Sequence, residues 1–217
     1  MKISLLPTKI LYSTSLVFSL MLGLSPSAYA YFSTLDTGDT LGANKYAVSI
    51  EPQLIFDRYD GANLNGRFDA GINEDSNLRA ILGVGVVNFQ AGAMYKYIPF
   101  PDTASQPAIG IEAGALLARV QDSSEFDVRI HPLISKKIAV EDLKLNMYGS
   151  LPFGVNFRTG TTYYPIQLAL GSEWKIPKYE QFSVMAELGI NINAAFGYLS
   201  FAGVYYFDQV HIERKAK

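Results

Sequence analysis

Apolar and polar residues alternate along residues 182–193, which read Phe-Ser-Val-Met-Ala-Glu-Leu-Gly-Ile-Asn-Ile-Asn. Successive side chains of a β-strand point to opposite faces, so this segment predicts a strand with one apolar and one mostly polar face. The pattern recurs along most of the chain after residue 44. We predict ten strands, at residues 45–57, 63–72, 78–87, 89–98, 108–120, 125–140, 143–157, 165–176, 182–193 and 196–207.

Turn signals separate these strands. Asp60-Gly61 is a strong hairpin signal, and the polar run 73–77 follows the second strand. Prolines exclude a central strand from the loop 99–107. An even number of strands of ~9–11 residues fits a membrane-spanning barrel. The fold class expected is all-β, a closed antiparallel up-and-down transmembrane β-barrel of about ten strands, with eight or twelve as open alternatives.

The first thirty residues form a separate unit. Lys2 and Lys9 give a positive start, residues 10–24 are mostly apolar and uncharged, and Ala28-Tyr29-Ala30 supplies small residues for cleavage. This pattern predicts a secretory signal peptide at 1–30. A retained transmembrane helix fits less well, because Ser and Thr interrupt a stretch short for a bilayer of ~30 Å. The expected organisation is therefore a signal peptide, a barrel at 31–207 and a polar tail at 208–217.

Charge and cysteine content narrow the function classes. Removal of Lys2 and Lys9 leaves 16 basic against 20 acidic residues, a net charge of −4. Nucleic-acid binding would need a basic patch and is not indicated. The chain has no cysteine, so neither disulfides nor thiolate chemistry are available. An exported chain without a further apolar helix is expected to be a soluble periplasmic or secreted protein, or a membrane barrel.

Three details favour the membrane barrel over a soluble, lipocalin-like barrel with its apolar face inside. The polar face is rich in glycine, which makes room in a narrow lumen, and aromatic residues gather near the predicted strand ends, as in the girdles of lipid-embedded barrels. The same face carries five basic and five acidic residues. We predict that these form a lumen charge network of Arg67, Asp69, Arg79, Lys96, Glu112, Asp127, Arg129, Glu173, Lys175 and Glu187.

The last predicted strand carries a family resemblance. Residues 200–207 read Ser-Phe-Ala-Gly-Val-Tyr-Tyr-Phe, and Ser200, Tyr205 and Phe207 match the terminal recognition strand of outer-membrane barrels. Ala202 stands where that pattern usually has Gly. Over residues 45–207 the chain thus resembles small bacterial outer-membrane β-barrels, without a subfamily. The resemblance implies a Gram-negative outer membrane, contact with its lipid, and recognition by the barrel-assembly machinery.

No motif indicates catalysis. On the sixth strand His131 shares a face with Ser135, whereas the outer-membrane lipid A deacylases, which look similar, have a Ser two positions after the His; here that position is Leu133. Neighbouring residues on one strand face lie ~7 Å apart, too far for a direct relay. His211 belongs to the polar tail, and residues 73–77 lack the spacing of a Ca²⁺ loop. We therefore expect no catalytic residues, no cofactor and no metal.

The strand number bears on function. Barrels of about eight strands are filled by their own side chains, and open aqueous channels need many more strands. Ten strands therefore favour a structural role or a narrow selective passage over a general porin. A soluble periplasmic barrel holding a lipid-like ligand and an envelope-lipid hydrolase remain alternatives. The sequence determines neither a transported solute nor an oligomeric state.

Overall fold

The computed structural model describes residues 33–56, 60–120, 123–140 and 143–208. The predicted signal peptide 1–30 and all of the predicted tail except Asp208 lie outside these residues. Within the described part, the chain forms twelve strands and no helix long and apolar enough to cross a membrane. The strands are β1 (Lys45–Phe56), β2 (Gly61–Asn73), β3 (Ser76–Gly85), β4 (Phe89–Phe100), β5 (Ala108–Val120), β6 (Ser123–Val140), β7 (Leu143–Ser150), β8 (Phe153–Arg158), β9 (Thr161–Tyr163), β10 (Ile166–Lys175), β11 (Phe182–Asn193) and β12 (Gly197–Asp208).

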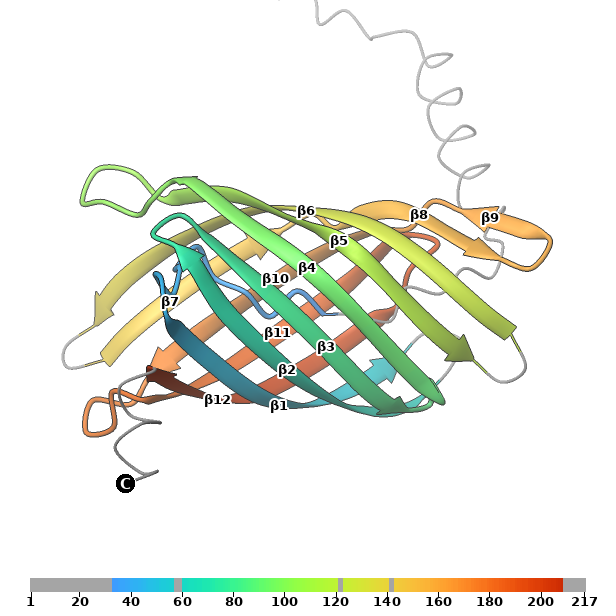
Figure 1. The fold of residues 1–217 in the computed structure, drawn as a ribbon, viewed down its shortest axis with the longest axis horizontal. Coiled ribbons are helices and arrows are strands. Elements are labelled where there is room, and N and C mark those ends of the chain that lie inside the picture. Colours follow the sequence, from blue (N-terminus) through green and yellow to red (C-terminus); the bar gives the residue numbers. More distant parts are fainter. Residues whose placement is uncertain (1–32, 57–59, 121–122, 141–142, 209–217) are drawn as a thin grey trace, which may run out of the picture.

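The strands close into one antiparallel barrel (Figure 1). Neighbours follow the order β1 to β7, then β10, β11 and β12, and β12 returns to pair with β1. The strand predicted at 143–157 is present as β7 and β8, which both pair with the 18-residue β6. The short β9 pairs with β8 alone. The ring therefore has ten strand positions, and the predicted closed barrel of about ten strands is confirmed.

Two predicted boundaries are wrong for a physical reason. β7 ends at Ser150 because Pro152 has no N–H to donate; its carbonyl instead accepts the amide of Gln167 at 2.9 Å. Conversely, β4 runs through Pro99 to Phe100, where the prediction had placed a loop. The pairing of β4 with β5 shifts register between Tyr97 and Phe100, so the proline lies in an irregularity where no ladder donor is needed.

The two faces of the wall differ in chemistry. Ile50 is 65% exposed on the outside of β1, while the adjacent Glu51 is fully buried inside. The same alternation on the other strands gives an apolar exterior and a polar interior. A soluble barrel with a lipid-like ligand would have the reverse arrangement. The most exposed outward side chains of the strands include Ile50, Leu54, Leu64, Leu82, Val84, Phe89, Leu117 and Ile192.

Aromatic side chains gather on the exterior at both ends of the barrel. We call the end where β1 begins and β12 finishes the terminal end. There Tyr46 stacks on Phe68 and Phe207, with ring centroids 5.9 and 5.6 Å apart. At the opposite end Phe126 stacks on Phe157 with centroids 6.3 Å apart. Two such belts flanking an apolar band are typical of membrane barrels.

Candidate functional site

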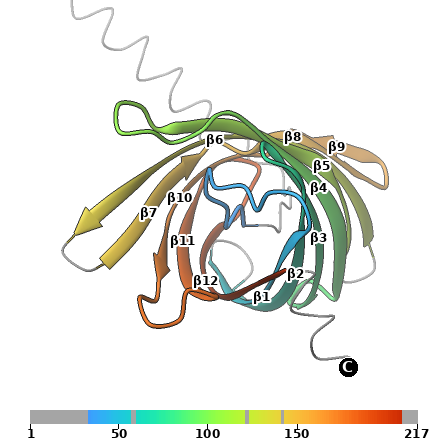
Figure 2. The same cartoon turned by 60° about the vertical axis from the view of Figure 1, so that its left-hand side comes forward.

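The lumen is occupied by the chain itself. Residues 33–42, which we call the plug segment, run through the interior before the chain turns into β1 (blue in Figure 2). Side chains from Ser33 to Thr37 are at most 5% exposed. The turn contains Asn44 with φ of 62°, a left-handed conformation that Asn tolerates better than most residues. The sequence assigned this segment to the barrel domain without placing it in the lumen.

Glu187 on β11 holds the start of the plug segment. Its carboxylate accepts the backbone amides of Thr34 and Leu35, at 2.8 and 2.6 Å. It also accepts the hydroxyls of Tyr148, at 2.8 Å, and Tyr198. Four donors converge on one fully buried carboxylate, and two of them belong to the plug segment. A buried charge of this kind is stable only when it is hydrogen-bonded in this way.

Two glycines make room for those tyrosine rings. A Cβ on Gly171 would clash with the ring of Tyr148, and one on Gly189 would clash with the ring of Tyr198. The inward glycines thus admit the tyrosines that position Glu187. A third glycine, Gly71 on β2, lies directly against the backbone of Gly42 at the end of the plug segment. Its missing side chain therefore allows the plug segment to leave the lumen along the wall.

Arg67 on β2 holds the other side of the plug segment. Its Nη1 donates to the Thr34 carbonyl and its Nη2 to the Ser33 carbonyl, both at 3.0 Å. The same guanidinium pairs with Glu51, with Nη2 to Oε2 at 2.7 Å. Ser33 in turn donates its hydroxyl to Glu51. The guanidinium therefore links the wall to two consecutive carbonyls of the plug segment in a fixed geometry.

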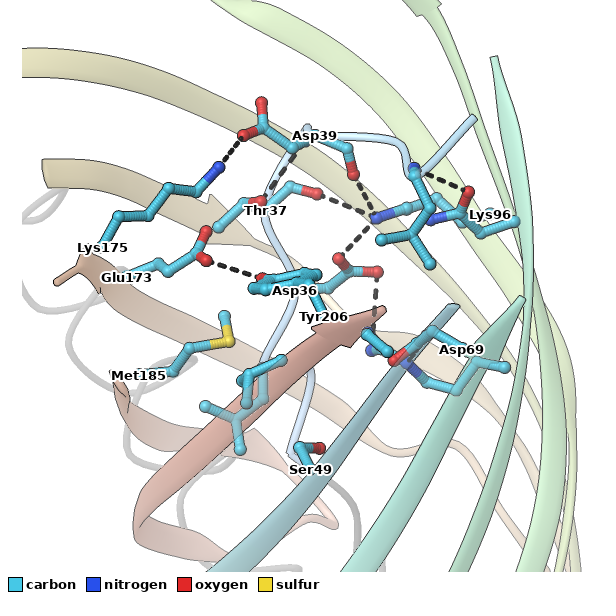
Figure 3. Close-up of a pocket in the computed structure, with 16 residues that line it drawn as sticks. Asp36, Thr37, Asp39, Ser49, Asp69, Lys96, Glu173, Lys175, Met185 and Tyr206 are labelled. Carbon is cyan, nitrogen blue, oxygen red and sulfur yellow. Dashed lines mark hydrogen bonds and ion pairs between the residues drawn. The ribbon is translucent and has the colours of Figure 1, made fainter. Parts of the chain in front are cut away.

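A second charge cluster lies closer to the terminal end (Figure 3). Asp36 of the plug segment pairs with Lys96 at 2.6 Å and with Arg79 at 3.4 Å. Arg79 also pairs with Asp69 at 2.6 Å and with Glu112 at 3.5 Å. Beside this cluster remains a cavity of about 60 Å³, room for about two water molecules. The plug segment therefore supplies the carboxylate that pairs with Lys96 and a further carboxylate for Arg79.

All ten residues of the predicted lumen charge network lie on the inward face, but they form several groups. Arg67, Arg79, Lys96 and Glu187 contact the plug segment, and Lys175 reaches Asp39 from the rim. Asp69 and Glu112 contact Arg79. The remaining three are engaged within the wall: Asp127 pairs with Arg129 at 2.6 Å, and Glu173 accepts the hydroxyl of Tyr206 at 2.7 Å.

Several interacting residues are missing from the predicted network, and five of them show why. Glu51 alternates with the same periodicity as the predicted members, so the sequence could have included it. Tyr148 and Tyr198 act through hydroxyls, which charge counting does not detect. Asp36 and Asp39 lie in a segment without strand periodicity, and no sequence signal placed them inside.

The candidate hydrolase pair has other partners. The hydroxyl of Ser135 accepts the backbone amide of Gly38 at 2.7 Å, so it too holds the plug segment. His131 Nδ1 lies 3.3 Å from Glu112. The residues that the structure describes contain no group of three His, Cys, Asp or Glu side chains placed to hold a metal ion.

Apolar side chains fill part of the lumen toward the opposite end. Phe196, in the turn between β11 and β12, is 2% exposed, and its carbonyl accepts the side-chain amide of Gln167. The inward apolar cluster consists of Ile55, Ile81, Val87, Met94, Leu116, Ala118, Val120 and Phe196. The plug segment and this cluster therefore occupy two successive levels of the lumen.

No protein-family model matches the chain, and no curated protein matches it. Among solved structures, a designed transmembrane β-barrel is similar with 12% identity and a TM-score of 0.38, over 76% of this chain and 97% of that chain. The β domain of the Bordetella autotransporter BrkA is similar with 11% identity and a TM-score of 0.44, over 76% of this chain and 98% of that chain. Such low similarities carry no argument about function. The chain resembles small outer-membrane β-barrels in fold, without a subfamily.

The grip of Glu187 on the plug segment can be tested with a single thiol. Since the chain lacks cysteine, Leu35→Cys places one reporter at a side chain that is 2% exposed. We expect this thiol to react slowly with a water-soluble maleimide. Adding Glu187→Gln should accelerate the reaction about 10- to 100-fold, because lost hydrogen bonds to a charge are worth about 1.5–3 kcal/mol. Adding Glu180→Gln, in the exposed turn before β11, is the matched control, and equal rates in both variants would refute the role of Glu187.

Proposed function

We propose that the protein is a bacterial outer-membrane β-barrel that is closed by its own N-terminal segment and has a structural role. The observation that carries the proposal is the plug segment, held by Glu187 and Arg67 in the lumen of a barrel with an apolar exterior. A passage for solutes would need this space.

The apolar exterior supports a membrane location. Large apolar side chains are exposed on strands all around the ring. Soluble monomers rarely expose contiguous apolar patches larger than a few hundred Å². A closed ring also pairs its strands without an open edge, as a spanning sheet in lipid must. Lipid is therefore the environment that suits this exterior.

Assembly and orientation follow from the same proposal. β12 pairs with β1 and so completes the ring. We propose that the barrel-assembly machinery recognises this strand through the outward Tyr205 and Phe207. The described ends of the barrel, at Lys45 and Asp208, lie at one end of the ring, which we place in the periplasm. The loop between β4 and β5 then faces the periplasm.

Displacement of the plug segment would be costly. Arg67 and Glu187 are buried and would lose carbonyls and amides of the plug segment. Asp36 would lose its ion pairs with Lys96 and Arg79. Removing one partner of a buried ion pair typically costs about 3–5 kcal/mol. This supports a stable closed state over the narrow selective passage.

We also propose that the barrel is not an enzyme, since Ser135 is engaged by the plug segment.

The membrane location predicts a strong effect at Ile50, in the middle of β1 and 65% exposed. Ile50→Arg should lower the free energy of unfolding in lipid vesicles by about 2–4 kcal/mol, the cost of a cation near the bilayer midplane. Urea titration of the vesicle-inserted protein measures it. The control Glu180→Arg lies in an exposed turn and should have little effect. If Ile50→Arg is as stable as this control, the outer face does not contact lipid.

If the lumen is closed, the barrel should not conduct ions across a membrane. The full chain should insert into planar bilayers without steady current, because two layers of side chains fill the lumen. A variant that lacks residues 33–42 and carries Phe196→Ala loosens both layers and should conduct. Single-channel recording in concentrated KCl compares the two. Steady current from the full chain, equal to that of the variant, would contradict the proposal.

A further inference from the structure

A second cavity lies at the mouth of the lumen, at the terminal end. Its volume is about 310 Å³, several times that of the cavity in Figure 3. Strands β6, β7 and β10 supply its wall, and Asp39 of the plug segment reaches into it. The lining residues are Asp39, Lys137, Ile138, Ala139, Lys144, Leu145, Asn146 and Lys175. The space exceeds what one small oxyanion with a few waters needs.

The charges of this cavity are unbalanced. Lys144 on β7 and Lys175 on β10 lie directly opposite each other in the strand pairing. Like charges in this position destabilise a sheet unless a counter-charge lies between them. Lys137 adds a third ammonium group, and among the described residues Asp39 is the single carboxylate in the lining.

Asp39 satisfies only part of this positive charge. Its carboxylate lies 2.7 Å from Lys137 Nζ and 3.4 Å from Lys175 Nζ. Among the described residues, Lys144 makes no ion pair. Two nearby charges are directed elsewhere: Glu173 accepts the hydroxyl of Tyr206, and Lys136 donates to Asp102. The Lys136 ammonium and the Lys137 backbone amide both donate to the Asp102 carboxylate, and together they hold the pKa of Asp102 below its ordinary value.

A buried amide also faces the cavity without a partner. Asn146 is 4% exposed, and within the described residues neither its side-chain nitrogen nor its oxygen has a hydrogen-bond partner. An unsatisfied buried polar group costs about 1–3 kcal/mol. A ligand oxygen in the cavity would accept the Asn146 amide N–H. This observation is independent of the lysines, and the unpaired nitrogen calls for an acceptor oxygen on a ligand.

We propose that this cavity binds a phosphate group, with Lys137, Lys144 and Lys175 as cationic contacts and Asn146 as a neutral donor. Lysine is a frequent phosphate ligand because its ammonium group acts as a point charge with three donors. Asp39 occupies part of the site as a tethered carboxylate and competes with the ligand. The site does not depend on whether the barrel conducts, because binding is measured directly.

The test uses the full chain in zwitterionic detergent micelles and inorganic phosphate as the probe, measured by titration calorimetry. Lys144→Gln should weaken binding about two- to fivefold, the upper range for one exposed charge contact. Asp39→Asn should strengthen binding by a similar factor, because it removes the competitor. Lys45→Gln changes the same charge at the same end of the barrel but outside the cavity, so it should leave binding unchanged. Heat-dependent mobility on a denaturing gel confirms that each variant is folded.

The results separate the possible sources of the phosphate group. Phosphatidylglycerol added to the micelles is the second probe. If its binding, rather than that of inorganic phosphate, follows the pattern of the three variants, the ligand is a lipid headgroup. The opposite result assigns a soluble phosphate. If neither probe binds, or if Lys144→Gln and Asp39→Asn behave like Lys45→Gln, the site is refuted. A stabilising role of Lys144 alone cannot produce tighter binding in Asp39→Asn.

Discussion

A barrel with an apolar exterior must place its charges in the lumen, and each buried charge there needs a partner. Glu187 shows how this requirement shapes the molecule. The wall offers its carboxylate two tyrosine hydroxyls, and the plug segment supplies two backbone amides. Arg67 depends on the plug segment in the same way, through two carbonyls. The wall and the plug segment therefore complete each other's hydrogen bonding, and neither is satisfied alone.

The geometry of the wall follows from that requirement. Tyrosine rings can reach Glu187 only because Gly171 and Gly189 carry no side chain where the rings lie. Gly66, on the same strand as Gly71 but facing outward, would meet nothing if it carried a Cβ, whereas Gly71 lies against the plug segment. The inward glycines thus shape an interior complementary to one particular segment. Such complementarity favours one bound state of the plug segment over a loosely filled channel.

Much of this architecture could be predicted from alternation alone. Each of the ten charged residues assigned to the lumen lies on the inward face, because a period of two determines the face once a strand is recognised. The break at Pro152 and the continuation of β4 through Pro99 were not predicted, because both depend on which neighbouring groups accept or omit a hydrogen bond. The plug segment was not predicted for a different reason. Residues 33–42 have no regular period, and their position is determined by partners such as Glu187, 152 residues away from Leu35 in sequence.

The docking of the plug segment can be tested in the unmodified protein by amide hydrogen exchange, resolved by NMR in micelles. The amides of Thr34 and Leu35 donate to a buried carboxylate, so they should exchange as slowly as the paired amides of β1. Exchange of both amides at the rate of an unstructured chain, in a barrel whose strand amides stay protected, would contradict the account.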